Sequence, residues 1–253
     1  MGASLAVSPT IKEEKMKAEN SDIGQDIVNT ILERPYLFKC EDGKREFYIY
    51  PKTLGKVLLV SEMLKGADID EANLRTNPYG EALRVCREHK ELVCRIVAIH
   101  AAPDKASVFD EKTMDERMNL AMRFDIQDIA KLFILLLVDD EVSRFCKHFG
   151  IDKEREWQEK ALKAKKDNST LTFGGKSVYG TLIDNACQRY GWTFDYVVWG
   201  IGYTNLRMLM ADAVNSVFLT DEERKRVHIP NDRNIVNMDD PRNKDIIKQM
   251  HWD

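Results

Sequence analysis

A glycine-rich stretch followed by a lysine and a serine is the first part of this sequence that could carry out chemistry. Residues 170–177 read TLTFGGKS. A phosphate-binding P-loop has the form G-x-x-x-x-G-K-[ST], in which backbone N–H groups surround the phosphates and the lysine reaches them. Thr170 stands where the first glycine belongs, and the acidic pair Asp139 and Asp140, which would hold Mg²⁺, comes before this stretch instead of after it. We expect a glycine turn that opens a helix, and the alternative is a nucleotide-dependent enzyme using Lys176 with the acidic pair.

A second glycine pattern occurs at Gly200-Ile201-Gly202. The dinucleotide fingerprint G-x-G-x-x-G requires a third glycine, between a strand and a helix, but position 205 is Asn205 and no alternation of strands and helices surrounds it. The pattern predicts two glycines that interrupt or introduce a helix.

Metal binding and nucleophilic catalysis have little support in the sequence. Cys146 and His148 supply two possible zinc ligands, whereas a structural zinc site normally has four. The other histidines are isolated, and no G-x-S-x-G nucleophile motif is present. We predict no catalytic residue, no metal and no cofactor, although a fold can assemble a site from distant residues.

Composition and charge narrow the class of protein. The chain has 253 residues with 38 Lys+Arg against 42 Asp+Glu, so its net charge of -4 predicts no general attraction to nucleic acid or anionic membranes. The longest apolar run, at 132–138, is much shorter than the roughly 20 residues of a spanning helix, so no membrane partner is expected. Five scattered cysteines, an odd number, favour a reducing cytoplasm over a disulfide framework.

The elements that must position these residues begin with a hairpin. Two aromatic-rich runs within 36–50 flank Asp42-Gly43, a strong short-range hairpin signal. Thr53 then caps a helix that Gly66 closes.

Helical periodicity dominates the rest of the chain. The apolar pattern predicts one long amphipathic helix over 78–102, a polar interruption over 103–124, and a buried helix that Asp125 caps. A helix that is polar almost all round follows Gly150 as a solvated connector.

The last third of the chain predicts a second helical unit. Thr193 caps a short helix through Trp199, and beyond the glycines an apolar stripe runs for about three turns from Leu206 to Phe218. A short helix with an acidic start and a basic end precedes Pro230.

Together these elements predict a mainly α fold, with a small N-terminal β-hairpin followed by two helical units. The expected divisions are a disordered arm over 1–24, a hairpin plus helical domain over 25–165, a C-terminal helical unit over 166–230 and an extended tail over 231–253.

Two stretches resemble the tail assembly chaperones of long-tailed bacteriophages and related prophages, particularly those of Bacteroides-type hosts. One is YLFKCEDGKREFYIYPKTLGKVLLV at 36–60, a hairpin that ends in an aromatic-Pro-x-Thr-Leu step into a helix. The other is YGWTFDYVVWGIGYTNLRMLMADAV at 190–214, an Asp-Tyr-x-x-aromatic segment before a Leu/Met helix.

The resemblance implies a mostly helical protein of the bacterial host cytoplasm that is not an enzyme. Such a chaperone binds the hydrophobic tape measure protein and keeps it soluble until tail-tube subunits polymerise around it, and it is expected to form a homo-oligomer. The implied contact residues match the aromatic and Leu/Met positions of the second stretch: Tyr196, Trp199, Tyr203, Leu206, Leu209 and Met210.

Other functions fit the same pattern. Aromatic and methionine residues at helical spacing usually form core, although methionine also suits adaptable binding surfaces. The alternatives to a chaperone are a structural component of the phage tail or neck and a helical adaptor protein.

Overall fold

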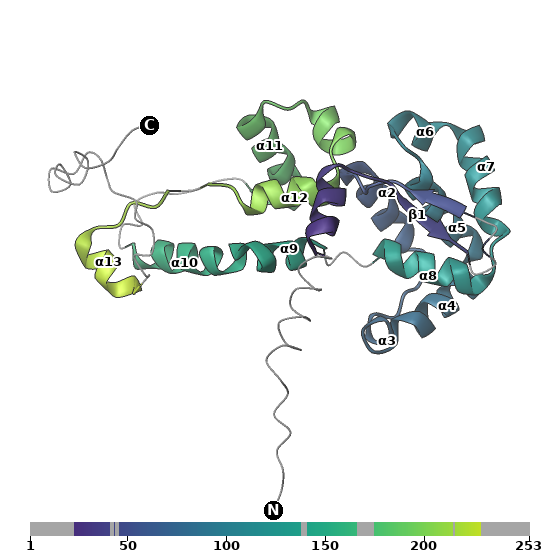
Figure 1. Cartoon of the computed structure of the whole chain (residues 1–253), viewed down its shortest axis with the longest axis horizontal. Helices are drawn as coiled ribbons and strands as arrows, with labels where there is room; N and C mark the ends of the chain where they lie inside the picture. The colour runs from purple at the N-terminus through teal and green to yellow at the C-terminus, as the bar shows by residue number, and fades with distance from the viewer. Residues whose placement is uncertain are drawn as a thin grey trace, which may run out of the picture. The chain divides into compact units, whose positions relative to one another are not determined.

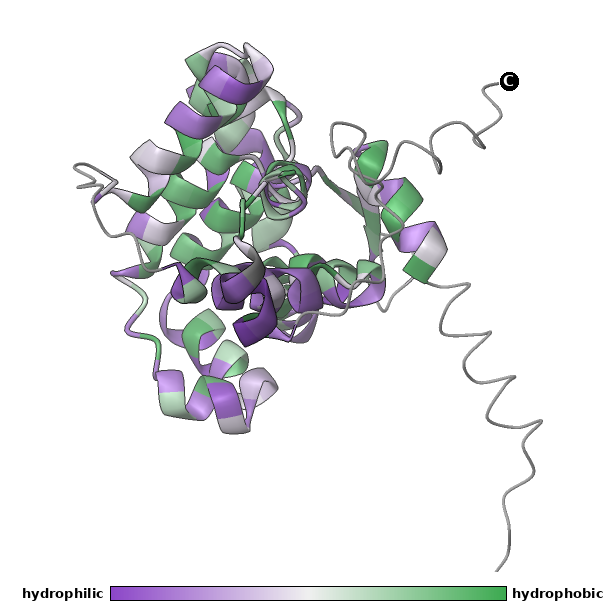
Figure 2. Ribbon diagram, turned by 90° about the vertical axis from the view of Figure 1, so that its left-hand side faces the viewer, coloured by the Kyte–Doolittle hydropathy of each residue, from purple (hydrophilic) through white to green (hydrophobic). Residues whose placement is uncertain are grey.

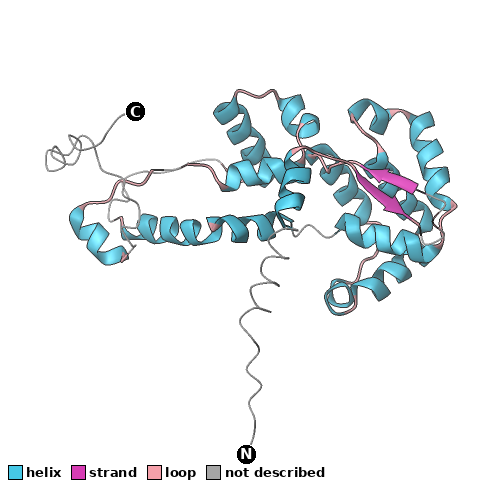
Figure 3. Ribbon diagram, viewed as in Figure 1, coloured by secondary structure: helices cyan, strands magenta, loops and turns pink. Residues whose placement is uncertain are grey.

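The computed structural model describes residues 23–40, 43, 46–137, 141–165, 175–214 and 216–228. Within these ranges the chain is mainly helical with one two-stranded antiparallel hairpin, which confirms the predicted fold class (Figures 1 and 3). Asp42, Asp139, Asp140, the tail over 231–253 and most of the predicted arm lie outside the described residues. Residues 23 and 24 were expected in that arm, but they begin a helix that continues to residue 31.

The chain divides into two compact units. The first comprises Met1–Ile151 and Phe173–Val214, and the second comprises Asp152–Thr172 and Asn215–Asp253. This grouping differs from the expected boundary near 166, because the helices after residue 175 pack with the first 151 residues.

The hairpin consists of β1, Tyr36–Lys39, and β2, Glu46–Ile49, with Phe38 opposite Phe47. Both of these rings are buried, and Phe47 lies edge-on to Phe124 with ring centroids 5.6 Å apart. Alternation along β2 therefore presents one face of the hairpin to the core.

Helix α2, Leu54–Leu64, begins where the sequence predicts, since the Thr53 side chain accepts a hydrogen bond from the Lys56 amide. The predicted long helix over 78–102 is wrong in one respect. It is broken at His89 into α4, Pro78–Glu88, and α5, Lys90–Ala101. The His89 backbone, with φ -130° and ψ 42°, is not helical, so the break lets α4 and α5 take different directions.

The polar stretch over 103–124 is not an interruption. It forms α6, Lys105–Phe109, and α7, Glu111–Met122. Each helix begins after an aspartate whose carboxylate accepts a backbone N–H three residues on, Asp104 from Ser107 and Asp110 from Thr113. Aspartate favours helix starts for this reason. The prediction of a polar interruption overlooked these caps.

The core of the first unit surrounds α5. This helix contacts α2, α4, α7, α8 and β2, and Val93, Ile96 and Val97 are fully buried. Helix α8, Ile126–Leu137, supplies a second buried face through Leu132 and Phe133, as the sequence predicts. Figure 2 shows hydrophobic and hydrophilic residues alternating along the helices of the chain. A short helix, α3, Glu71–Thr76, precedes α4.

Four further elements complete the described part of this unit. Helix α9, Glu141–Phe149, packs against α12, Tyr203–Ala211, and helix α11, Val178–Tyr190, packs against the π-helix η1, Tyr196–Gly200. Helix α12 ends at Ala211, so the predicted stripe to Phe218 is too long, and Val214 is 82% exposed.

In the second unit, α13, Asp221–Val227, is the expected short helix, and it starts with a capping box in which Thr220 and Glu223 bond each other's backbone amides. Helix α10, Ile151–Ala164, has its polar residues on nearly every side. No helix among the described residues of the chain is long and apolar enough to cross a membrane.

Candidate protein-binding surface

Two segments far apart in the chain meet in one junction of the first unit. The amide of Tyr203 donates a 2.5 Å hydrogen bond to the carbonyl of Lys52, and Thr53 and Gly202 form an antiparallel β-bridge. The step from the hairpin into α2 is therefore joined directly to the start of α12. The two segments lie within 36–60 and 190–214, the two stretches singled out in the sequence.

A second contact of the junction depends on a missing side chain. A Cβ atom on Gly55 would lie 2.6 Å from the ring of Trp199, so the indole occupies the space that any other residue would fill. Its other side meets Phe109, edge-on with ring centroids 5.5 Å apart. Trp199 is thus held between α2 and α6.

Gly202 meets a carboxylate from the same protein. It is the N-cap of α12 and has no side chain that could accept a hydrogen bond there. Glu33 lies at this position, and its Oε1 accepts from the Gly202 amide at 2.7 Å and from the Asn205 side chain at 3.1 Å. A helix N-terminus favours a negative charge, and Glu33 supplies one.

Aromatic residues form a cluster beside this junction, in which Tyr190 and Trp192 are partly buried and Tyr196 is exposed. Tyr190 stacks on Trp192 with ring centroids 4.6 Å apart, and Trp192 meets the Tyr196 ring edge-on at 5.2 Å. The Tyr190 hydroxyl donates to the Leu209 carbonyl at 3.1 Å, which joins the cluster to α12. We call this the aromatic surface, and Phe194, within its loop, is 65% exposed.

The structure separates the six predicted contact residues by exposure. Tyr196 and Leu209 are 43% and 41% exposed and belong to the aromatic surface. Leu206 is fully buried, and the other three residues are partly buried in the packing of the unit. Those three are Trp199, Tyr203 and Met210. Two of the six side chains are therefore available to a partner in this conformation, and four hold the surface in place.

Sequence reasoning missed several members of the surface. Tyr190, Trp192 and Phe194 lie within the second resembling stretch, but their i, i+2 spacing belongs to no helical stripe. Tyr190 ends α11, and Trp192 and Phe194 follow it in the loop. A ring contact joins Tyr190 to Trp192, so only the unusual density of aromatic residues signalled them.

The glycine-lysine-serine stretch behaves as expected of a helix start. Ser177 caps α11 by accepting from the Gly180 amide at 3.1 Å, and Lys176 is exposed. Cys146 and His148 do not form a metal site, because Cys146 is buried with its sulfur 3.9 Å from the Met208 sulfur, whereas His148 is exposed. The described residues contain no cluster of three or more His, Cys, Asp or Glu that could hold a metal ion.

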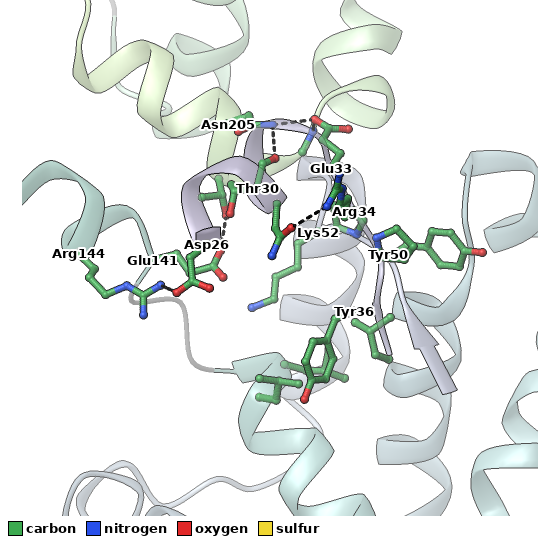
Figure 4. Close-up of a pocket in the computed structure, with 18 residues that line it drawn as sticks. Asp26, Thr30, Glu33, Arg34, Tyr36, Tyr50, Lys52, Glu141, Arg144 and Asn205 are labelled. Carbon is green, nitrogen blue, oxygen red and sulfur yellow. Dashed lines mark hydrogen bonds and ion pairs between the residues drawn. The ribbon is translucent and has the colours of Figure 1, made fainter. Parts of the chain in front are cut away.

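A hollow of about 590 Å³ lies on the other side of the junction (Figure 4). Leu135, Leu136 and Ile49 contribute apolar lining. The carboxylates around it are already bonded within the protein, Asp26 to Arg144, Glu33 to the start of α12 and Glu141 to Thr204. The Lys52 side chain extends into the hollow in Figure 4.

Two buried basic side chains support the segments around the junction. The Lys56 ammonium donates to the carbonyl of Ala102 at 2.7 Å, and burial, with a smaller contribution from Arg117, lowers its pKa to about 8. Burial also lowers the pKa of His100 to about 4, and its Nδ1 lies 2.9 Å from the Ile96 carbonyl oxygen. Both groups are enclosed, so they stabilise the fold and do not reach a substrate.

The chain matches no family model, no curated protein and no solved structure.

Proposed function

We propose that this protein is a bacteriophage tail assembly chaperone that binds the tape measure protein through the aromatic surface. The observation that carries the proposal is the exposure of Tyr196, Phe194 and Leu209, by 43%, 65% and 41%, on the stretch that the junction joins to α2. Exposed aromatic and leucine side chains on a rigid support are anchors for an apolar partner helix.

The chemistry of the client agrees with such a surface. A tape measure protein is long, helical and apolar, so a chaperone must bind it weakly at many places and release it as tail-tube subunits polymerise. Several copies of a shallow aromatic surface achieve this through multivalency, without a deep pocket or a catalytic group. The proposal places the protein in the bacterial host cytoplasm as a homo-oligomer.

Co-expression with the very large helix-rich protein encoded nearby tests the proposal. We expect the wild-type chain to keep that protein soluble and to co-purify with it. A Phe194→Ser, Tyr196→Ser, Leu209→Ser variant should lose both effects while it remains folded. The matched control is Leu120→Ser on α7, which removes a leucine that is 40% exposed and should leave client binding intact.

Two results would overturn the proposal. If the triple variant solubilises the client as well as the control does, the aromatic surface is not the binding site. If the protein is found in purified mature particles, it is a structural tail or neck component, because a chaperone leaves before the particle is complete.

A further inference from the structure

The helix over residues 23–31 is attached to its unit through its polar side. Asp26 pairs with Arg144 on α9, and the Thr30 carbonyl accepts from the Asn205 side chain at 2.9 Å. Val28, Ile31 and Leu32 are exposed by 45%, 64% and 56%, whereas Ile23 and Ile27 are partly buried. A helix on a globular protein ordinarily buries its apolar side, and this one buries only part of it. We call it the inverted helix because its polar side makes the attachments.

A hollow, and not a packed core, lies beneath the inverted helix. Asp26, Asn29 and Thr30 line the hollow of about 590 Å³ that has Ile49 and Leu136 in its lining (Figure 4). Cores are normally packed without such space. The helix is therefore held by a few polar bonds and gains little from apolar burial.

Glu33 makes two of these attachments. Its two hydrogen bonds reach Gly202 and Asn205, at the start of α12. Its backbone has φ +51°, a left-handed conformation that costs free energy for any residue with a side chain. A Cβ atom on Gly202 would lie 3.0 Å from the Glu33 carboxylate, so only glycine admits so close an approach without a shift.

We propose that residues 23–34 form a latch, which is closed in this structure and is held in place by Glu33. The latch opens as a unit and uncovers the hollow and the first turn of α12. A helix of this length is not stable by itself in water. The segment therefore unfolds locally when the hydrogen bonds of Glu33 break. Opening uncovers Ile49 and Leu136, which line the hollow and are 8% and 6% exposed in the closed form. The latch does not depend on the proposed function, and its test needs no client.

Hydrogen–deuterium exchange of the full-length protein, followed by mass spectrometry of its peptides, tests the latch. In the wild type, amides of residues 24–33 should exchange more slowly than in an unstructured peptide but faster than those of α5. Glu33→Ala should accelerate exchange of this segment by about tenfold, because a helix cap is lost, and leave α5 unchanged. Glu33→Gln, which can still accept the hydrogen bonds, should have a smaller effect.

The matched control is Glu62→Ala, which removes an exposed glutamate that pairs with Lys65 on α2. It should leave the exchange of residues 24–33 at the wild-type rate. The latch is ruled out if residues 24–33 exchange as slowly as α5 in the wild type and Glu33→Ala accelerates both equally, since the helix is then part of the global unfolding unit. It is also ruled out if the wild-type segment exchanges like an unstructured peptide.

Discussion

The amide of Tyr203 donates its hydrogen bond to the carbonyl of Lys52, and this bond joins the end of the hairpin to the start of α12. The β-bridge of Thr53 with Gly202 lies directly beside it. Because these contacts are made by backbone atoms, they fix the two segments whatever side chains they carry. The aromatic surface is thereby anchored to the hairpin and α2, and changes at the junction should affect it from a distance.

Replacing Gly55 with alanine should damage the junction. The new methyl group would lie 2.6 Å from the Trp199 ring, which is confined on its other side by Phe109. We expect a loss of about 1 to 3 kcal/mol in the free energy of unfolding, measured by urea denaturation, as for overpacking elsewhere. The control is Gly66→Ala at the end of the same helix, where the nearest atom is the Met63 carbonyl oxygen at 3.5 Å. A Gly55→Ala protein as stable as this control contradicts the expectation.

Side chains within the predicted contact set should differ sharply in their effect on stability. Leu206 is fully buried, so Leu206→Ala should cost about 2 to 5 kcal/mol. Tyr196 is 43% exposed, and Tyr196→Ser should cost about 1 kcal/mol, mainly through its ring contact with Trp192. Thermal unfolding of the two variants measures the difference, and equal losses would mean that Tyr196 is part of the core.

Acid should destabilise the protein through His100. The folded-state pKa of His100 is about 4, below the ordinary histidine value of 6.5. Between these two pH values the unfolded state binds a proton that the folded state does not. Stability is therefore lost as the pH falls from 6.5 towards 4, by about 2 to 3 kcal/mol at pH 4.5. Urea denaturation at pH 7 and pH 4.5 should show a smaller loss for His100→Leu than for the wild type, and equal losses would contradict the assignment.

Alkali should have the opposite effect through Lys56. The folded-state pKa of Lys56 is about 8, below the ordinary lysine value of 10.5. The folded state therefore releases this proton at a lower pH than the unfolded state does. The free energy of unfolding of the wild type should increase relative to Lys56→Met by about 2 to 3 kcal/mol between pH 7.5 and pH 10.

The comparison with Lys56→Met is necessary because other groups titrate in the same range. Burial raises the pKa of Cys86 to about 12 and that of Cys94 to about 11, and these thiols lower stability as the pH rises. They are present in both proteins, so their contribution cancels. A difference that does not change with pH would mean that Lys56 titrates in the folded state as it does in the unfolded chain.

Local signals in the sequence predicted α2, α11, α13 and the hairpin, although the aspartate caps of α6 and α7 were missed. The caps at Thr53, Ser177 and Thr220 and the hairpin around Gly43 each depend on residues a few positions apart, so they can be recognised without tertiary structure. The break at His89 could not be found in this way, because apolar residues continue on both sides of it and the change of direction is a property of packing.

The candidate site was predicted in part. The stretch that contains Tyr196 and Leu209 was identified, but exposure within it depends on neighbours distant in the chain. Leu206 and Trp199 match the apolar pattern as well as Leu209 does, and only the contacts with α2, α6 and α11 decide which side chains are covered. The inverted helix gave no signal either, because its polar attachments are to α9 and α12.

The contact of Trp199 with Gly55 also affects how the protein folds during its synthesis. A ribosome that adds 5 to 20 residues per second needs on the order of ten seconds to proceed from α2 to η1. During that interval the face of α2 at Gly55 lacks Trp199, and the Lys52 carbonyl lacks the Tyr203 amide. Folding of the first unit is therefore completed only after residues 190–214 emerge, and a nascent chain paused before them exposes an apolar surface that the finished protein covers.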